Sequence, residues 1–125
     1  MIQLSTIQQW LQEIGWRFEA EDDSTLRIVC PDVENLPFFA RCTEHWLLLA
    51  IVPAIARTAP RPPDLARRLL AVNRDMKLAK YAYHENGDVA LTAELPTESL
   101  DASELRDAVQ RMARYAEHYK SYLSA

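Results

Sequence analysis

The sequence has 125 residues, of which 49% are hydrophobic and 26% charged, and its formal net charge is -4. This profile is typical of one soluble globular domain spanning 1–125, long enough to bury a core but too short for two domains. An acidic chain has no general attraction to nucleic-acid phosphates or to anionic lipid, so we expect neither as a partner.

We expect neither a signal peptide nor a membrane-spanning segment in this sequence. The longest apolar run, 46–56, is shorter than the roughly 18 to 20 residues of a membrane-spanning helix and contains a proline. The N-terminal stretch "MIQLSTIQQW" lacks the basic and apolar regions of a signal peptide. We therefore expect a cytoplasmic protein.

The segment 4–15 is predicted to form the first helix. Ser5 or Thr6 is expected to cap its start, and Gly15 suits the left-handed position that follows a last helical turn. One apolar face follows the i, i+3, i+4, i+7 spacing and consists of Ile7, Trp10, Leu11 and Ile14.

After this helix the apolar period changes to two, which predicts a hairpin of strands over 16–20 and 26–30 with one buried face. We expect a loop over 31–37 and two further strands over 38–42 and 46–52. The last of these shows no alternation of apolar and polar residues. It is therefore expected either to be central and covered on both faces, or to be covered on its second face by another chain.

A second helix is predicted to open near Pro63–Asp64, because proline fits the first helical position and an acidic residue suits the positive end of the helix dipole. Two strand-like segments follow, 77–84 and 89–95. The Asn86–Gly87 pair between them is a strong hairpin signal, because both residues tolerate a positive φ.

The last predicted helix runs from about residue 100 to 123. Asp101 with Glu104 forms the pattern of a capping box, and Leu100 with Leu105 can form a hydrophobic staple around it. Its apolar stripe consists of Leu105, Val109, Met112 and Ala116, with Tyr115, Tyr119 and Tyr122 close beside it.

The predicted order is helix, four strands, helix, two strands, helix. Hairpins and meanders dominate, so the sheet is expected to be antiparallel with helices packed on it, which makes an α+β domain.

This order is similar to that of a known family. The segment 69–95, with a Leu-rich helix end, an asparagine and the hairpin turn "ENGD", resembles the core of the YbjN family. The segments 15–29, 36–54 and 100–119 fit the same template, so the resemblance covers nearly the whole chain. It implies a fold like that of type III secretion chaperones, with an extra strand after the first helix that is more like YbjN than like those chaperones.

The resemblance also implies a function. Proteins of this kind are small, acidic, usually homodimeric and without catalytic activity, and such chaperones hold an extended segment of a client protein against their surface. The family pattern carries over no catalytic, cofactor or metal-binding residues.

Three histidine–carboxylate groups are candidates for a metal or catalytic site. His84, Glu85 and Asp88 flank the predicted hairpin turn, where a solvated tip offers no enclosed geometry or supporting shell. Glu44–His45 and Glu117–His118 likewise lack the spacing of a zinc site. We interpret all three as scaffold and expect no cofactor.

The cysteines are expected to be buried structural thiols. If a hairpin forms around the loop 31–37, Cys30 lies opposite Phe38, and Cys42 is roughly 13 Å further along, too far for a disulfide. An alternative strand pairing would change this estimate. The chain has no G-x-S-x-G motif, and its 2 glycines exclude a Gly-rich phosphate loop.

A group of arginines in the middle of the chain suggests the hypothesis that the protein binds nucleic acid. The acidic net charge and the lack of a helix-turn-helix or aromatic–basic sheet pattern argue against it. A solvated face or a contact with a partner is the preferred interpretation for Arg57, Arg61, Arg67 and Arg68.

Apolar side chains exceed what one small sheet face needs, and surplus apolar surface usually marks association. We expect the strand over 46–52 and the last helix to form a surface for self-association or for a partner. The candidate residues are Phe38, Phe39, Trp46, Leu48, Tyr115, Tyr119 and Tyr122.

The sequence thus predicts a non-enzymatic protein-binding module, chaperone-like or adaptor, that forms a homodimer and receives an extended client segment on an apolar groove or a sheet edge. Two alternatives stay open. One is a regulatory module that binds a small ligand or a folded partner, and the other is an enzyme that uses His84 or His45. Neither alternative has a positive sequence feature.

Overall fold

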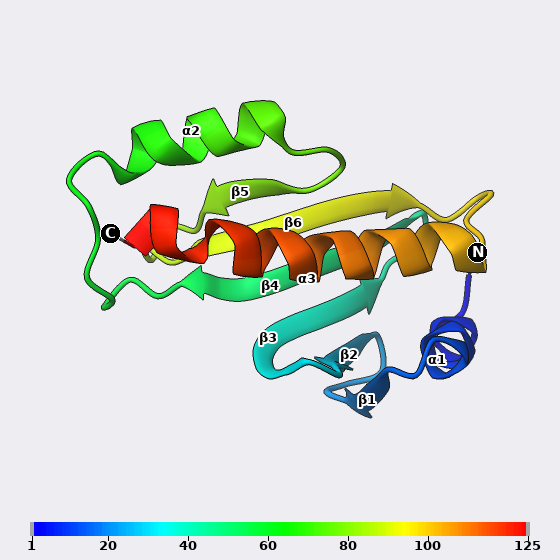
Figure 1. The fold of residues 1–125 in the computed structure, drawn as a ribbon. Helices are drawn as coiled ribbons and strands as arrows, with labels where there is room; N and C mark the ends of the chain where they lie inside the picture. The colour runs from blue at the N-terminus through cyan, green and yellow to red at the C-terminus, as the bar shows by residue number, and fades with distance from the viewer. Residues whose placement is uncertain (1, 125) are drawn as a thin grey trace.

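The computed structural model describes residues 2–124 and consists of a six-stranded antiparallel sheet with three helices (Figure 1). The order of the elements confirms the predicted fold class. The elements are α1 Leu4–Glu13, β1 Arg17–Ala20, β2 Thr25–Cys30, β3 Val33–Cys42, β4 Trp46–Ile55, α2 Leu65–Asp75, β5 Lys80–Tyr83, β6 Val89–Pro96 and α3 Ala102–Ser124.

The strands lie in the order β1-β2-β3-β4-β6-β5. Each pairs with its neighbours in antiparallel fashion, so β1 and β5 form the two edges and β4 lies between β3 and β6. β5 is an edge strand because the chain returns from it to β6, which takes the place beside β4.

The helices cover one face of this sheet. α1 and α2 each contact α3, and α3 packs along β4 and β6 (Figure 1). Alternate residues of the strands point toward the helices, as the period of two requires. The inward positions of β4 and β6 are buried and comprise Leu47, Leu49, Ile51, Val89, Leu91, Ala93 and Leu95.

The first helix ends as predicted but begins differently. Gly15 has a φ of +81°, and its N–H donates to the Gln12 carbonyl at 3.0 Å, so this residue ends α1 in the left-handed conformation. The predicted cap is wrong: the N-cap is Gln3, without a side-chain cap bond, because the helix already begins at Leu4. Ser5 therefore lies within the first turn.

The predicted loop over 31–37 is also wrong, because β3 begins at Val33. Cys30 pairs with Val33, so the chain reverses within Pro31–Asp32, and Cys30 does not lie opposite Phe38. The Cys42 N–H instead donates to the Ser24 carbonyl, at the far end of β2. The two free cysteines therefore lie at opposite ends of the β2–β3 hairpin.

The hairpin between β5 and β6 is present, with a longer turn than predicted. His84 N–H donates to the Asp88 carbonyl at 2.8 Å, which encloses three residues, 85–87. Gly87 takes the positive φ of +94°, whereas Asn86 does not have a positive φ. A three-residue loop of this kind needs a left-handed residue only at its last position, which Gly87 supplies.

The start of α3 confirms the predicted capping box. The Glu104 N–H donates to Asp101 Oδ1 at 2.8 Å, and the Asp101 N–H donates to Glu104 Oε1 at 3.3 Å. The reciprocal pair satisfies two backbone donors that the helix itself leaves without partners.

Candidate protein-binding surfaces

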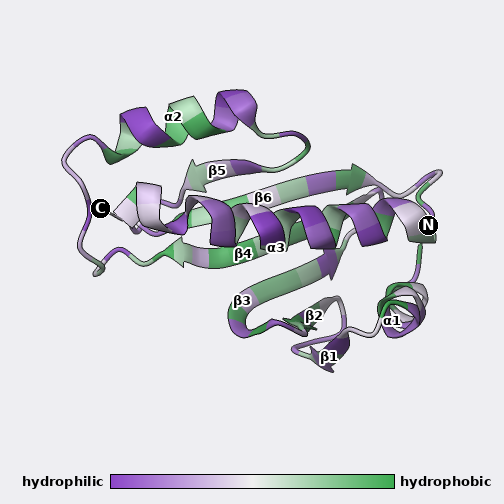
Figure 2. Ribbon diagram, viewed as in Figure 1, coloured by the Kyte–Doolittle hydropathy of each residue, from purple (hydrophilic) through white to green (hydrophobic). Residues whose placement is uncertain are grey.

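The second face of the sheet carries no helix in the described chain. β4 presents Trp46, Leu48, Ala50 and Val52 on this side; Trp46 is 44% exposed and the other three are half-buried. The first alternative for this strand is therefore right that it is central but wrong that its own chain covers both faces. Figure 2 shows β4 hydrophobic along most of its length. We call this side of the sheet the open face.

Charged residues flank the apolar centre of the open face. Arg41 on β3 pairs in register with Leu48 on β4, and Leu48 pairs with Glu94 on β6. Arg41, Leu48 and Glu94 therefore form one row across three strands. Two residues further along β4, Ala50 lies beside Phe39 of β3. Within residues 2–124, neither Arg41 nor Glu94 forms an ion pair or a side-chain hydrogen bond, and both are exposed.

Phe38 does not belong to this surface, and the sequence-based expectation for it is corrected. Its side chain is fully buried among the helices, and its ring packs against Trp16 edge to face, with 6.0 Å between centroids. Adjacent residues of a strand point to opposite faces, so Phe38 is in the core while Phe39 lies half-buried on the open face.

The tyrosines of α3 lie together on the flank that meets α2. The Tyr115 hydroxyl accepts a hydrogen bond from the Lys77 N–H at 2.9 Å, which lowers the pKa of Tyr115. Tyr115 and Tyr119 have ring centroids 6.1 Å apart. The Arg68 guanidinium lies 5.2 Å from the centroid of the Tyr122 ring. Tyr115 and Tyr122 thus join α3 to α2 and to the loop that follows it.

A trough lies on the helix side, beside α3; β3 and β4 bound its first part, and Trp16 and the turn between β2 and β3 bound its second part. Its first part is a pocket of about 290 Å³, and its second part is an opening of about 490 Å³. Val33 and Glu117 line both parts, so the two adjoin one another. Small residues and prolines dominate the first part, including Pro37, Pro53, Ala54, Ala56, Ala59, Pro60 and Ala116.

The trough exists because β3 and β4 separate. Their pairing starts at Phe38↔Ile51, and residues 33–37 of β3 have no partner on β4. Both strands are irregular at this point, with register shifts at 34–37 of β3 and at 52–54 of β4. Figure 1 shows β3 turning away from β4 here. Sequence reasoning missed this opening, since it treated 31–37 as a loop.

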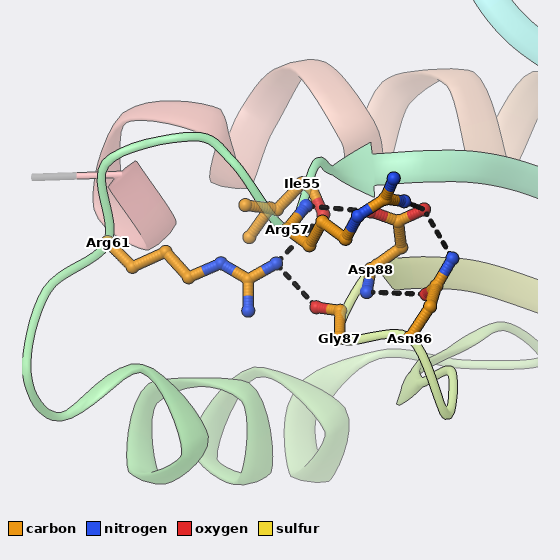
Figure 3. A network of polar contacts seen from close by, with 6 residues as sticks. All are labelled: Ile55, Arg57, Arg61, Asn86, Gly87 and Asp88. Atoms are coloured by element: carbon orange, nitrogen blue, oxygen red, sulfur yellow. Dashed lines mark hydrogen bonds and ion pairs between the residues drawn. The ribbon is translucent and has the colours of Figure 1, made fainter.

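The hairpin turn with His84 and Asp88 is hydrogen-bonded to the segment that follows β4. Asp88 Oδ1 accepts a hydrogen bond from the Arg57 N–H at 2.6 Å, and Arg61 donates to the Gly87 carbonyl at 2.6 Å (Figure 3). The bond from the Arg57 N–H is the main cause that lowers the pKa of Asp88. The network fixes the turn to the segment after β4, and it also accounts for Arg57 and Arg61.

The other two candidate arginines lie on α2. Arg68 forms an ion pair with Asp64 at 2.9 Å, in addition to its contact with Tyr122. Arg67 is exposed. Across residues 2–124, no cluster of three or more His, Cys, Asp or Glu side chains has the arrangement of a metal site. In the same range no helix is both long and apolar enough to cross a membrane.

Comparisons with solved structures show the same fold. A chain of the heterodimeric complex ExoU–SpcU from the type III secretion system of Pseudomonas aeruginosa is 23% identical, with a TM-score of 0.69 over 94% of this chain and 97% of that chain. The structure of the Yersinia pestis secretion chaperone SycH with a fragment of YscM2 gives 11% identity and a TM-score of 0.65, covering 91% and 96%. Identities this low show the fold alone.

YbjN from E. coli is 15% identical, with a TM-score of 0.65 over 97% of this chain and 93% of that chain. A search of curated proteins gave no match. The sequence profile of the YbjN family, described as "Putative bacterial sensory transduction regulator", matches residues 3–124. Because the match spans nearly all of the sequence and the fold agrees with it, the chain belongs to the YbjN family.

Proposed function

We propose that the chain is a non-enzymatic, cytoplasmic protein-binding module that holds an extended segment of a partner protein in the trough beside α3. The observation that carries the proposal is the shape of this trough. Two openings that share Val33 and Glu117 run along α3 from Gln110 to Ser124, so the space is long and narrow.

The length of the trough suits an extended chain. At about 1.5 Å per residue, the stretch of α3 that lines it is about 21 Å long. An extended segment of about six residues has the same length. The first pocket alone, at about 290 Å³, is at the lower end of the range for small-molecule sites, about 300 to 1,000 Å³. It suits one or two apolar side chains of a bound segment.

The walls of the trough offer two kinds of contact. Residues 33–37 of β3 lack a partner on β4, and their backbone can pair with an added strand. Small apolar side chains of β4 and α3 leave room for alternate side chains of that strand. Glu117 and Lys120 lie at the wall contributed by α3 and can pair with charges on the partner.

The relatives in fold support a protein partner. ExoU–SpcU is a heterodimeric complex, and SycH was solved with a stable fragment of YscM2. We also propose that the chain associates with itself, through Phe39, Trp46 and Leu48 on the open face, because no helix of the described chain covers these apolar side chains. We assign the tyrosines of α3 a supporting part, because Tyr115 and Tyr122 hold α3 in place as one wall of the trough.

A second candidate function is a regulatory module that binds a small ligand or a folded partner. The description of the family as a sensory transduction regulator favours it. It differs from the first proposal in what fills the trough: a compact ligand or a folded domain instead of an extended segment.

The experiment that tests the first proposal is capture of tagged protein from lysate of its host, followed by mass spectrometry. Ala116 lines the trough, so Ala116→Trp fills it; Ala66, exposed on α2, gives Ala66→Trp as a matched control. We expect a stoichiometric partner that is retained by Ala66→Trp and lost by Ala116→Trp. Limited proteolysis of the complex then identifies the protected segment.

Two outcomes would contradict it. A partner that Ala116→Trp retains as well as the wild type binds elsewhere than in the trough. A protected region that is a whole folded domain, or a bound small molecule in place of a protein, favours the regulatory module. Circular dichroism of both variants shows whether the fold is intact.

A further inference from the structure

We infer that the open face binds the open face of a second copy, about a two-fold axis parallel to β4 that sets Arg41 of each copy against Glu94 of the other. This inference rests on the proposed self-association and adds its geometry. It starts from an observation about charge: Arg41 and Glu94 are exposed, opposite in sign and without a partner in the described chain, on either side of the apolar β4.

The strand register determines which symmetry brings these charges together. Arg41, Leu48 and Glu94 occupy one row, with Leu48 on the central strand. Rotation by 180° about an axis parallel to β4 exchanges the two sides of β4 and keeps every residue at its level along the strand. β3 of one copy then lies over β6 of the other. Arg41 therefore meets Glu94 twice in one dimer.

The same rotation places the apolar residues of β4 on their own counterparts. Leu48 faces Leu48 and Ala50 faces Ala50, while Trp46, 44% exposed in the single chain, lies beside its equivalent at the end of the interface. Two sheets stacked in this way have nearly aligned strands and lie about 10 Å apart. Long side chains such as arginine and glutamate can bridge that distance from opposite sheets.

A two-fold axis perpendicular to the strands does not give this pairing. Such an axis places β3 of one copy over β3 of the other, and β6 over β6. Arg41 of one copy therefore does not reach Glu94 of the other. An axis centred on their row would even place Arg41 against Arg41. Charge complementarity thus selects the parallel axis.

One pair of like charges is brought closer by the preferred axis. Arg27 lies two strands from β4 on one side and Lys80 two strands away on the other, in the row of Ala50. Both are already engaged within the chain. Arg27 reaches the Glu34 carbonyl, and Lys80 Nζ donates to the Met76 carbonyl at 2.7 Å, at the end of α2. Each cation is thus held at a carbonyl of its own chain.

The test is an exchange of charges, read by sedimentation equilibrium over a range of protein concentrations. Arg41→Glu or Glu94→Arg alone creates two like-charged contacts per dimer, and we expect each to weaken association by about 10-fold or more at low salt. The double variant Arg41→Glu/Glu94→Arg restores opposite charges and should return to within about threefold of the wild type. Arg67→Glu, at an exposed position of α2, is the matched control and should not change the association.

Each contrary result is informative. A wild-type chain that stays monomeric at all concentrations overturns the inference together with the proposed self-association. A dimer that tolerates both single variants overturns only the geometry, since another surface then holds the copies together. Loss of association in both singles without recovery in the double overturns the Arg41–Glu94 pairing. Capture of a partner through the trough is measured separately, so its failure is distinguishable.

Discussion

Asn73 near the end of α2 acts as the partner of an edge strand. Its side-chain amide donates to the Tyr81 carbonyl at 3.0 Å, and its Oδ1 accepts from the Tyr81 N–H at 2.8 Å. The single side chain thus makes both hydrogen bonds that a neighbouring strand would make to that residue. It ties α2 to β5, which has a strand neighbour on one side only.

We predict that Asn73→Ala lowers the free energy of unfolding by about 1 to 3 kcal/mol, because two hydrogen bonds are lost, each worth roughly 0.5 to 1.5 kcal/mol. Asn73→Asp keeps the acceptor for the Tyr81 N–H and loses the donor, so its free energy of unfolding should lie between those of the wild type and Asn73→Ala. Urea unfolding measures the difference, with Asn35→Ala at an exposed position as the control. Equal midpoints for Asn73→Ala and the wild type would show that water replaces the amide at no cost.

Asp88 is expected to make the folding stability of the chain depend on pH in the acidic range. Because the Arg57 N–H holds the pKa of Asp88 below its usual value, the folded state favours the carboxylate more than the unfolded state does. This contribution is fully present above the unfolded pKa of about 3.9 and is lost as the pH falls through the lower folded value. Asp88→Asn should therefore destabilise the protein at pH 6 and lose that disadvantage progressively below about pH 4.

The measurement is the urea midpoint of the wild type and of Asp88→Asn at pH values from 6 to 3. Asp23 has no hydrogen bond or ion pair in the described chain, so Asp23→Asn should parallel the wild type throughout. If the gap between Asp88→Asn and the wild type stays constant over the whole range, the carboxylate charge is not what stabilises the turn.

Single residues also show where sequence reasoning reaches its limit. Gly15 and the Asp101–Glu104 pair were predictable, because each acts through its own backbone neighbourhood. The roles of Asn73 and Asp88 were not, since their partners, Tyr81 and Arg57, are set by how α2 and β4 pack. The sequence suggested a scaffold role for Asp88, and only the structure shows which segment it holds.

Among the elements, α3 is the one whose N-terminal capping box should matter for the stability of the whole fold. The helix forms one wall of the trough and packs on both α1 and α2, so fraying of its first turn reaches the core through buried Leu105. We predict that Asp101→Ala costs about 1 kcal/mol of folding stability, the usual value for loss of an N-cap. Chemical denaturation measures it, and Glu98→Ala, exposed just before the helix, serves as the control.

A conservative variant separates the cap from simple loss of charge. Asp101→Asn still accepts a hydrogen bond from the Glu104 N–H, so it should keep most of the stability that Asp101→Ala loses. If Asp101→Asn is as unstable as Asp101→Ala, the charge at the helix N-terminus matters and the hydrogen bond does not.

The strands were harder to predict than the helices. The apolar period located β2 and the continuous apolar run 46–52 located β4, but the pattern 31–37 contains two prolines and an asparagine, which also suit a loop. In the structure these residues form an irregular beginning of β3, and this irregularity opens the trough. A register shift depends on the partner strands, so no local pattern in this segment could have revealed it.

At the scale of the whole molecule, the sequence predicted surplus apolar surface on the strand over 46–52 and on the last helix, but it did not decide which face of the sheet the helices cover. Phe38 and Phe39 are chemically alike and adjacent, yet one is in the core and the other on the open face. The alternation assigns them to opposite sides, and only the helices decide which side is covered. The same holds for Trp16, which is buried, and Trp46, which is exposed.

The trough and the open face lie on opposite sides of one sheet, so a partner segment and a second copy do not compete for the same residues. A dimer formed through the open face therefore presents two troughs on its outer sides. A partner with two segments that reach both troughs would bind more tightly than one with a single segment, through effective concentration alone.

Self-association has a thermal consequence that needs no knowledge of the partner. If two copies bind through the open face, only folded chains associate, so the Tm must rise with protein concentration. When the free folded chain is at about 100 times the Kd, dimerisation stabilises it by about 3 kcal/mol, which is a shift of several degrees for a domain of this size. Scans by calorimetry from low to high micromolar protein should show that rise in the wild type and in Ala116→Trp, whose change lies in the trough. In Arg41→Glu the same rise should begin only at about 10-fold higher protein concentration or above, because association is weaker by that factor. A wild-type Tm that does not move over a hundredfold range would mean that the chain is monomeric, and that solvent alone covers Trp46 and Leu48.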